Sequence, residues 1–259
     1  MPDSPRRRRL RASALLAALV PAGLGAGCGG TSGPVTLTVL ASSSLTEVFG
    51  EVGTAYHQEH PGVRVRFEFG GSPEMVDRLS EHVSGDVLVT GDPASMRDAA
   101  EYLAGRPRII AHDTLTIAVR PGNPRRVRDL RDLGRPGLRV VVGAAGVPVG
   151  RYTRQVLAKA GLTVRWSSEE ISARAVLDRI RSGGADAGIV YITDMRSAGV
   201  AASSVPIPAD MNVMTSFPAA VVEDSEHQEA ANAFVSWLLT PTAQKLFHKY
   251  GFPNPASPR

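Results

Sequence analysis

Four short turns in this sequence place small, donor-rich residues immediately before a helical segment. The turns are "ASSSLTE", "GGSPEM", "AAGVPVGRY" and "SSEEISARA", and their candidate site residues are Ser44, Ser72, Val149 and Ala173. The first turn of a helix presents backbone N–H groups without intrahelical acceptors, together with the positive end of the helix dipole. Such turns bind anions through neutral donors. The sequence therefore predicts anion recognition, with Tyr191 at the end of "AGIVY" as a fifth donor.

The serines in these turns also have an ordinary structural explanation, because serine is a preferred helix N-cap. Ser44 precedes Glu47 at capping-box spacing, and Ser72 precedes Pro73, which suits the first helical position. Ser172 is expected to cap a helix that begins at residue 173. A cap alone stabilises a helix by about 1 kcal/mol. The functional interpretation therefore depends on the four turns and the tyrosine together.

Short β-branched runs alternate with helical periodicity from residue 34 onward, which predicts an α/β protein with mainly parallel strands. We predict strands at 35–41, 63–69, 86–90, 114–119, 138–143, 162–166, 187–192 and 217–222. We predict helices at 45–58, 73–79, 93–103, 151–160 and 173–181, and two more after 226. In open sheets of this kind, ligands bind at the carboxyl ends of the strands, where the four turns lie.

Two turn-rich breaks, at 120–126 and 206–218, divide the predicted elements into two lobes. The first lobe is expected to comprise residues 34–118 and 219–259, and the second residues 119–218. The crossings near 118 and 219 are expected to act as hinges. Ser44 and Ser72 then belong to the first lobe, whereas Val149, Ala173 and Tyr191 belong to the second. A bound anion is therefore expected to bridge the lobes.

The chain of 259 residues has a formal charge of +4, but the excess is confined to its beginning. Residues 1–27 hold five arginines and one acid, and the remainder holds 24 basic and 24 acidic residues. A neutral domain gives no electrostatic argument for nucleic-acid binding. The basic run, the apolar stretch at 12–24 and the small residues before Cys28 predict a signal peptide at 1–27, too short to span a bilayer.

Cys28 is the only cysteine, so no disulfide within the chain is possible. The segment "LGAGC" resembles a bacterial lipobox, which implies that Cys28 carries a lipid and that residues 28–33 form an anchor and tether. The protein is then expected on the outer face of the cytoplasmic membrane. The alternative is a periplasmic, soluble protein with one unmodified cysteine. Export by the Sec or the twin-arginine route stays open.

Several segments together resemble the periplasmic molybdate-binding proteins, the solute receptors of molybdate ABC importers. They are "TVLASSSLTEVF", "FEFGGSPEMVDRL", "DVLVTGD", "GVPVGRY", "ADAGIVYITD" and "FPAAVV…TAQKLFHKYGF". The resemblance implies a two-lobed periplasmic-binding-protein fold of type II, with no enzyme activity and no cofactor. It implies that molybdate or tungstate is held by the hydroxyls and amides of Ser44 and Ser72, the amides of Val149 and Ala173 and the hydroxyl of Tyr191. The implied partners are importer permease subunits, and a monomer is expected.

The predicted donors suit a fully deprotonated tetrahedral dianion, because each can donate a hydrogen bond and none is an obligatory acceptor. Phosphate carries a proton near neutral pH and needs an acceptor, and none of the five residues is acidic. Asp86 and Asp92 bracket "VLVTG", but Asp92 before Pro93 is expected to be a helix cap. Sulfate meets the same donor requirement, so a receptor for another tetrahedral oxyanion is the alternative.

Three other functions find less support in the residues. A secreted serine hydrolase built on Ser42 to Ser44 lacks a histidine in the usual order, and no GxSxG, P-loop or HExxH motif occurs. An iron receptor needs clustered tyrosines, and only Tyr191 stands at a strand end. His57 and His60 lack a third ligand at metal-ligand spacing. We therefore expect no directly ligated metal ion.

Overall fold

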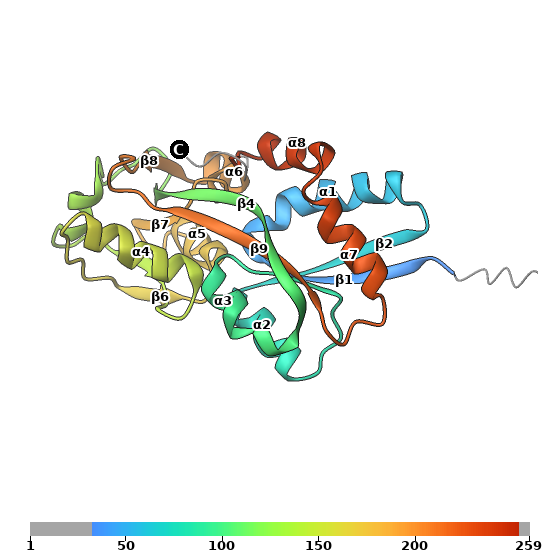
Figure 1. Cartoon of the computed structure of the whole chain (residues 1–259). Helices are drawn as coiled ribbons and strands as arrows, with labels where there is room; N and C mark the ends of the chain where they lie inside the picture. Colours follow the sequence, from blue (N-terminus) through green and yellow to red (C-terminus); the bar gives the residue numbers. More distant parts are fainter. Residues whose placement is uncertain (1–32, 254–259) are drawn as a thin grey trace, which may run out of the picture. The chain divides into compact units, whose positions relative to one another are not determined.

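The computed structural model describes residues 33–253 of the chain, which form an α/β structure with two lobes (Figure 1). The strands of the first lobe are β1 (Val35–Ser42), β2 (Val63–Gly70) and β3 (Val87–Val89). Those of the second lobe are β5 (Val140–Gly143), β6 (Ser168–Glu170), β7 (Ala187–Tyr191) and β8 (Ser203–Pro206). Two longer strands, β4 (Leu103–Val119) and β9 (Met214–Val222), connect the lobes.

The strands follow the order β2-β1-β3-β9-β4-β7-β5-β6, and β8 pairs with β4 outside this path. β1 is parallel to β2 and β3, and β5 is parallel to β6 and β7. The connecting strands β4 and β9, and also β8, are antiparallel to their neighbours. Parallel neighbours require crossover connections, which explains why helices alternate with strands. The predicted α/β class with mainly parallel strands in each lobe is confirmed.

The passage between the lobes lies within β4 and β9. β4 pairs with β9 as far as Thr114, opposite Met214, and from Leu115 onward it pairs with β7. The change of sheet therefore falls at Thr114 and Met214. The predicted lobe limits at 118/119 and 218/219 lie a few residues further along the same two strands. Turns can be recognised from their residues in a sequence, whereas the point at which a continuous strand changes its pairing partner has no sequence pattern of its own.

Helices cover both faces of the sheet in the first lobe. Along β1, Leu37 and Val39 pack into the core beneath α1 and α7, while Leu40 points to the opposite face beneath α2 and α3. This division follows from the alternation of side chains along a strand. The helices of this lobe are α1 (Thr46–Glu59), α2 (Ser72–Ser80), α3 (Pro93–Asp98), α7 (Gln228–Trp237) and α8 (Pro241–Lys249).

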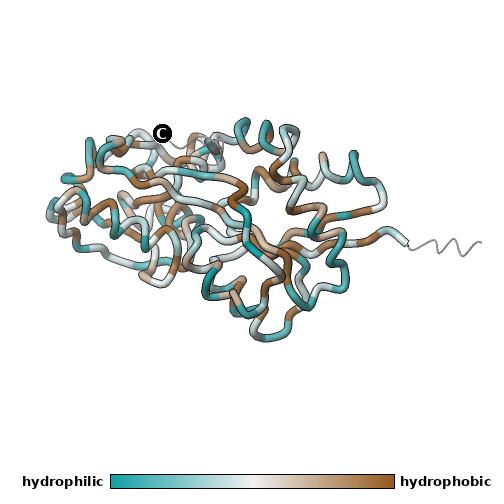
Figure 2. The backbone as a smooth tube through the Cα atoms, viewed as in Figure 1, coloured by the Kyte–Doolittle hydropathy of each residue, from teal (hydrophilic) through white to brown (hydrophobic). Residues whose placement is uncertain are grey.

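The second lobe repeats this arrangement around β5. Val140 and Val142 pack into the core on the side of α4, and Val141 packs with the residues of α5 on the other side. Apolar residues accordingly concentrate on the central strands, and polar residues on the outer turns of the helices (Figure 2). The helices of this lobe are α4 (Pro148–Lys159), α5 (Ala173–Arg181) and α6 (Asp194–Ala198).

Several element predictions were wrong, each for a local reason. The helix predicted at 93–103 ends at Asp98, and after a 3-10 turn β4 begins at Leu103. This first half of β4 contains Gly105, with a positive φ of 73°, and Pro107, and it is bulged, so it resembles a loop in sequence. The strand predicted at 162–166 is absent from the described residues, and the edge strand β6 forms at 168–170 instead. β8 was not predicted.

No helix in the part of the chain that the structure describes is both long and apolar enough to cross a membrane. The predicted signal peptide, Cys28 and residues 28–32 of the predicted tether lie outside the described residues.

Candidate functional site

A small cavity between the lobes brings together all five predicted site residues. Its walls come from the ends of β1 and β2 in the first lobe, and from the starts of α4 and α5 and the end of β7 in the second. About 10 Å³ is open to the centre of a water-sized sphere, which suits a compact ion rather than a sugar or a peptide. The predicted site residues in the wall are Ser44, Ser72, Val149, Ala173 and Tyr191.

Ser44 lies in a 3-10 turn, Ser43–Leu45, between β1 and α1. The prediction that it caps α1 was wrong: α1 begins at Thr46, and the residue before it, Leu45, makes no side-chain cap bond. The inserted turn moves the helix start two residues beyond Ser44. The Ser44 side chain is buried, and its hydroxyl has no hydrogen-bond partner in the described structure. This hydroxyl is therefore left to serve the cavity.

Ser72 is the first residue of α2, and Gly71 occupies the N-cap position that was predicted for Ser72. The Ser72 Oγ accepts a hydrogen bond from the Gly91 amide at 2.9 Å. Because this bond uses a lone pair, the hydroxyl hydrogen stays available to donate. The Ser72 amide, in the first turn of α2, also lacks an intrahelical acceptor. Both donors belong to a residue that is 1% exposed and lines the cavity.

The second lobe contributes two helix N-termini. Val149 follows Pro148 in the first turn of α4, where backbone amides have no intrahelical acceptor. Ala173 is the first residue of α5, and its amide has the same status. The predicted cap at Ser172 is confirmed, since its Oγ accepts from the Ala175 amide at 3.1 Å. The positive ends of two helix dipoles therefore meet at the cavity.

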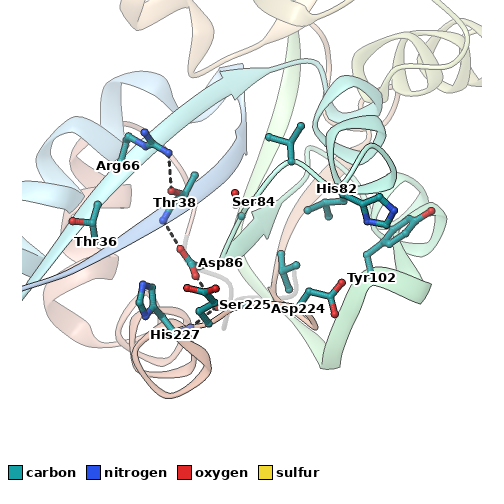
Figure 3. Close-up of a pocket in the computed structure, with 15 residues that line it drawn as sticks. Thr36, Thr38, Arg66, His82, Ser84, Asp86, Tyr102, Asp224, Ser225 and His227 are labelled. Atoms are coloured by element: carbon teal, nitrogen blue, oxygen red, sulfur yellow. Dashed lines mark hydrogen bonds between the residues drawn. The ribbon is translucent and has the colours of Figure 1, made fainter. Parts of the chain in front are cut away.

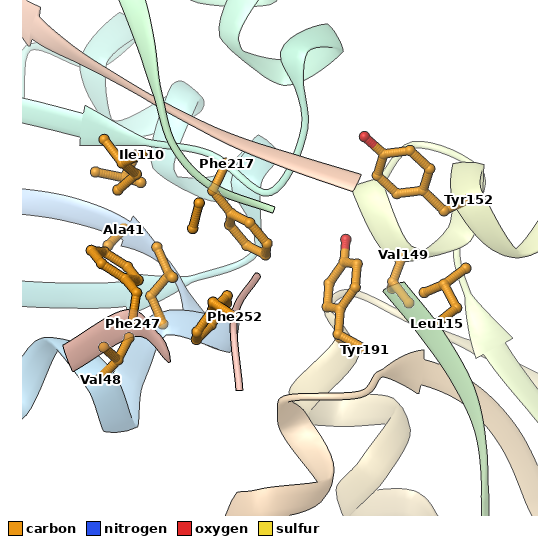
Figure 4. Packing of buried hydrophobic residues seen from close by; sticks show 14 of the residues in the cluster. Ala41, Val48, Ile110, Leu115, Val149, Tyr152, Tyr191, Phe217, Phe247 and Phe252 are labelled. Atoms are coloured by element: carbon orange, nitrogen blue, oxygen red, sulfur yellow. The ribbon is translucent and has the colours of Figure 1, made fainter. Parts of the chain in front are cut away.

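Tyr191 ends β7 and is 2% exposed. Its ring packs against Phe217 of β9, with ring centroids 5.6 Å apart (Figure 4). The Tyr191 hydroxyl is buried and has no hydrogen-bond partner among the described residues. Burial raises the pKa of this phenol well above its usual value, and the neighbouring Tyr152 and Asp194 raise it further. The hydroxyl therefore stays protonated and can act as a donor.

Charged residues are absent from the described wall of the cavity but stand close behind it. Two ion pairs connect the lobes: Arg151 of α4 with Asp92 at 2.7 Å, and Arg174 of α5 with Glu47 of α1 at 2.8 Å. Each cation is neutralised by an acid of the facing lobe. The cavity thus offers neutral donors and helix dipoles, and no full charge, to a ligand.

Sequence reasoning missed these ion pairs, although it placed Asp92 correctly as a cap. The Asp92 Oδ1 accepts from the Ser95 amide at 2.8 Å. A second missed feature is Gly71, where a Cβ would stand 2.5 Å from the Ile171 carbonyl oxygen of the second lobe. Both features depend on contacts between lobes, for which the sequence carries no local signal. The "GG" before Ser72 was the one available hint.

A larger polar hollow of about 420 Å³ lies elsewhere on the first lobe (Figure 3). Its central acid, Asp86, accepts from the Thr38 amide and from the Ser225 hydroxyl, each at 2.6 Å. The Arg66 guanidinium donates to the Thr38 hydroxyl at 3.1 Å. These polar groups satisfy one another, so Asp86 has a structural role. The small cavity between the lobes is the one with unpaired buried hydroxyls in its wall.

The geometry also bears on the alternatives of a hydrolase and a metal site. No histidine lines the described cavity wall, so Ser44 lacks there the histidine base of a Ser-His hydrolase. His57 Nδ1 lies 2.8 Å from the Val63 carbonyl oxygen, as in a locally satisfied histidine. Within residues 33–253, no three His, Cys, Asp or Glu side chains form a group that could hold a metal ion. Of the described tyrosines, Tyr191 alone lines the cavity.

Residues 37–253 match the model of a family described as bacterial extracellular solute-binding proteins. The molybdate-binding protein ModA of Mycobacterium tuberculosis (strain ATCC 25618 / H37Rv) is 34% identical over 229 residues, 88% of each chain. The periplasmic molybdate-binding protein of Azotobacter vinelandii has a similar structure, with a TM-score of 0.73, 20% identity and coverage of 86% of this chain and 100% of that one. The sulfate-binding protein SubI of Mycobacterium tuberculosis H37Rv matches with a TM-score of 0.75, 22% identity and coverage of 86% and 88%. The predicted two-lobed periplasmic-binding-protein fold is thereby confirmed.

Proposed function

Because the chain belongs to the bacterial extracellular solute-binding proteins, we propose that it binds molybdate between its lobes and delivers it to an ABC importer. The observation that carries this proposal is the pair of buried, unpartnered hydroxyls of Ser44 and Tyr191, one from each lobe, in the wall of one cavity. A buried polar group without a partner costs about 1–3 kcal/mol. An anion that accepts from both hydroxyls removes that cost, and it does so only when the lobes are closed.

The remaining donors complete a shell for a tetrahedral dianion. The Ser72 hydroxyl and amide come from the first lobe, and the amides of Val149 and Ala173 come from the second. Since the donors are divided between the two lobes, the ligand bridges the lobes and favours the closed form. The molybdate-binding relatives support molybdate as the ligand. Tungstate has the same charge and shape, and we propose that it binds as well.

Sulfate is the second candidate, because the likeness to a sulfate-binding protein supports a smaller tetrahedral dianion with the same donor requirement. Hydrogen phosphate needs an acceptor for its proton, and no acidic residue lines the described wall. We therefore expect tight binding of molybdate and tungstate, weak binding of sulfate and no binding of phosphate.

We also propose where the protein works. The signal peptide at 1–27 exports the chain, and Cys28 carries the lipid that holds it at the outer face of the cytoplasmic membrane. The closed, loaded form is then recognised by the permease subunits of the importer. The receptor acts as a monomer, without a cofactor and without catalysing a reaction.

Isothermal titration of residues 29–259 with molybdate, tungstate, sulfate and phosphate tests this function. Ser44→Ala removes a charge-assisted donor worth about 1.5–3 kcal/mol, so the affinity for molybdate should fall about 10- to 150-fold. Ser80→Ala, at an exposed serine in the last turn of α2, is the control and should bind as the wild type does. Phosphate binding comparable to molybdate binding would contradict the assignment.

A further inference from the structure

A buried carboxyl group, that of Asp194, adjoins both residues that carry the unpartnered hydroxyls, Ser44 and Tyr191. Asp194 is the first residue of α6, is 4% exposed, and its Oδ2 accepts from the backbone amide of Tyr191 at 3.1 Å. The Ser44 hydroxyl, from the other lobe, lies close enough to stabilise the charged form of Asp194, although it makes no hydrogen bond of good geometry. Asp194 thus adjoins a proposed ligand residue from each lobe.

Charged groups from several elements face Asp194. Glu47 of α1 opposes its negative charge, whereas Arg174 of α5 favours it. The fully buried Asp113 of β4 lies nearby, and burial, together with the charge of Asp194, raises the pKa of Asp113 well above its usual value. The Asp113 carboxyl group accepts hydrogen bonds from the Thr193 hydroxyl and the Thr114 amide. Burial dominates this balance and raises the pKa of Asp194 to about 7. In the closed structure without an anion, both protonation states of Asp194 are therefore populated near neutral pH.

The two protonation states of Asp194 differ in where the single hydrogen of the Ser44 hydroxyl can be donated. Beside a charged Asp194, that hydrogen is drawn to the carboxylate and is lost to a ligand in the cavity. Beside a protonated Asp194, the carboxylic acid donates to the Ser44 Oγ, and the Ser44 hydrogen is free to donate to the anion. The protonated state also removes a negative charge from the neighbourhood of a dianion.

We propose that Asp194 is a positioning residue that takes up a proton when a dianion binds and thereby turns the Ser44 hydroxyl toward it. This inference depends on the proposed oxyanion function and adds a proton to the bound state. The proton moves from solvent to a carboxylate oxygen of Asp194, and no covalent bond of the ligand changes. Fully deprotonated anions are then selected, because the proton of the complex resides on the protein.

Linkage fixes the sign of the pH dependence. A bound dianion raises the pKa of Asp194 above its value of about 7 in the closed structure without an anion, so binding is accompanied by proton uptake above that pH. The affinity is therefore full below about pH 7 and falls as the pH rises, by up to about tenfold per pH unit, until the pKa of the complex is reached. Molybdate itself stays a dianion over this range.

Titration calorimetry of residues 29–259 with sodium molybdate at pH 8, in buffers of different ionisation enthalpy, counts the protons taken up. The wild type should take up a substantial fraction of one proton per anion, and Asp194→Asn should take up none and bind with an affinity independent of pH. Asp113→Asn tests the neighbouring buried carboxyl of β4, and Asp178→Asn tests an exposed one on α5. Both should keep the wild-type proton uptake.

Infrared difference spectra of the wild type provide a second measurement that needs no variant. Adding molybdate at pH 8 should produce the carbonyl band of a protonated carboxylic acid. Tight molybdate binding without proton uptake, or uptake that persists in Asp194→Asn, overturns the role of Asp194 and leaves the oxyanion function intact. Absence of molybdate binding at every pH overturns the function and this inference together.

Discussion

The substitution Asp92→Asn separates the contribution of lobe closure to affinity from simple electrostatics. The Asp92 carboxylate is 4% exposed and receives Arg151 of the facing lobe through two bonds, from Nε at 2.7 Å and from Nη2 at 2.9 Å. Asparagine remains a good N-cap for α3, so the helix start is preserved. Removing a negative charge near the site should favour an anion. Weakening a contact that exists only in the closed form should oppose binding.

The structure indicates which effect is larger. Hydrogen bonds to a charged partner contribute about 1.5–3 kcal/mol and neutral ones about 0.5–1.5 kcal/mol, so each bond from Arg151 loses about 1 kcal/mol. An asparagine oxygen replaces one acceptor, and its NH2 group opposes the other donor. The closed form of Asp92→Asn should lose about 2 kcal/mol, which lowers the affinity for molybdate roughly 30-fold.

The second interlobe ion pair provides the matched control. The side chains of Arg174 and Glu47 are 34% and 36% exposed, and such pairs contribute about 0.2–1 kcal/mol. Glu47→Gln should therefore weaken molybdate binding less than about fivefold. Titration calorimetry measures both variants, and small-angle scattering with and without molybdate reports closure. If Asp92→Asn binds as tightly as the wild type or more tightly, the interlobe contact does not contribute to affinity.

Three further outcomes are expected. Tyr191→Phe should weaken molybdate binding about 10- to 150-fold. The melting temperature of the ligand-free protein should stay unchanged or rise, because the lost hydroxyl has no hydrogen-bond partner among the described residues. A fall in melting temperature without loss of affinity would contradict this. Gly71→Ala places a Cβ 2.5 Å from a carbonyl oxygen of the facing lobe, a clash that costs about 1–3 kcal/mol in the closed form. In the control Gly50→Ala, the new Cβ meets nothing within 4 Å. Titration calorimetry should therefore show a lower affinity for molybdate in Gly71→Ala alone. Cys28→Ser should move the protein from the membrane fraction to the soluble fraction with unchanged oxyanion affinity; continued membrane association would exclude the anchor.

Most of the parallel strands of both lobes could be predicted from the sequence, because they are β-branched runs with clear limits. The run at 35–41 became β1 at 35–42, and the runs at 63–69 and 187–192 became β2 and β7 with limits within one residue. Buried strands flanked by helices need apolar residues on both faces, and this requirement appears in the sequence as a short run of apolar residues. The bulged half of β4 was not visible, because its glycine and proline match a loop as well as an irregular strand.

The sequence predicted which residues line the candidate site, but it did not predict which serines serve as helix caps and which keep a free hydroxyl. Serine between a strand and a helix predicted both a cap and an anion donor, and only Ser172 proved to be a cap. The 3-10 turn after β1 removed Ser44 from the cap position, and Gly71 took the place predicted for Ser72. Shifts of one or two residues decide whether a hydroxyl is consumed by its own helix or left for a ligand, and local sequence does not encode shifts of that size.

Charge is distributed between the lobes in a way that bears on closure. With the change of sheet as the boundary, the described part of the first lobe holds 8 Lys or Arg against 16 Asp or Glu, and residues 115–213 hold 15 against 8. The lobes therefore attract each other at long range, and the two interlobe ion pairs are the local form of that attraction. Salt screens such attraction between exposed charges but acts weakly on buried amides and hydroxyls that contact an anion. Because no charged side chain lines the described cavity wall, the dependence of affinity on salt should come mainly from closure rather than from contact with the ligand.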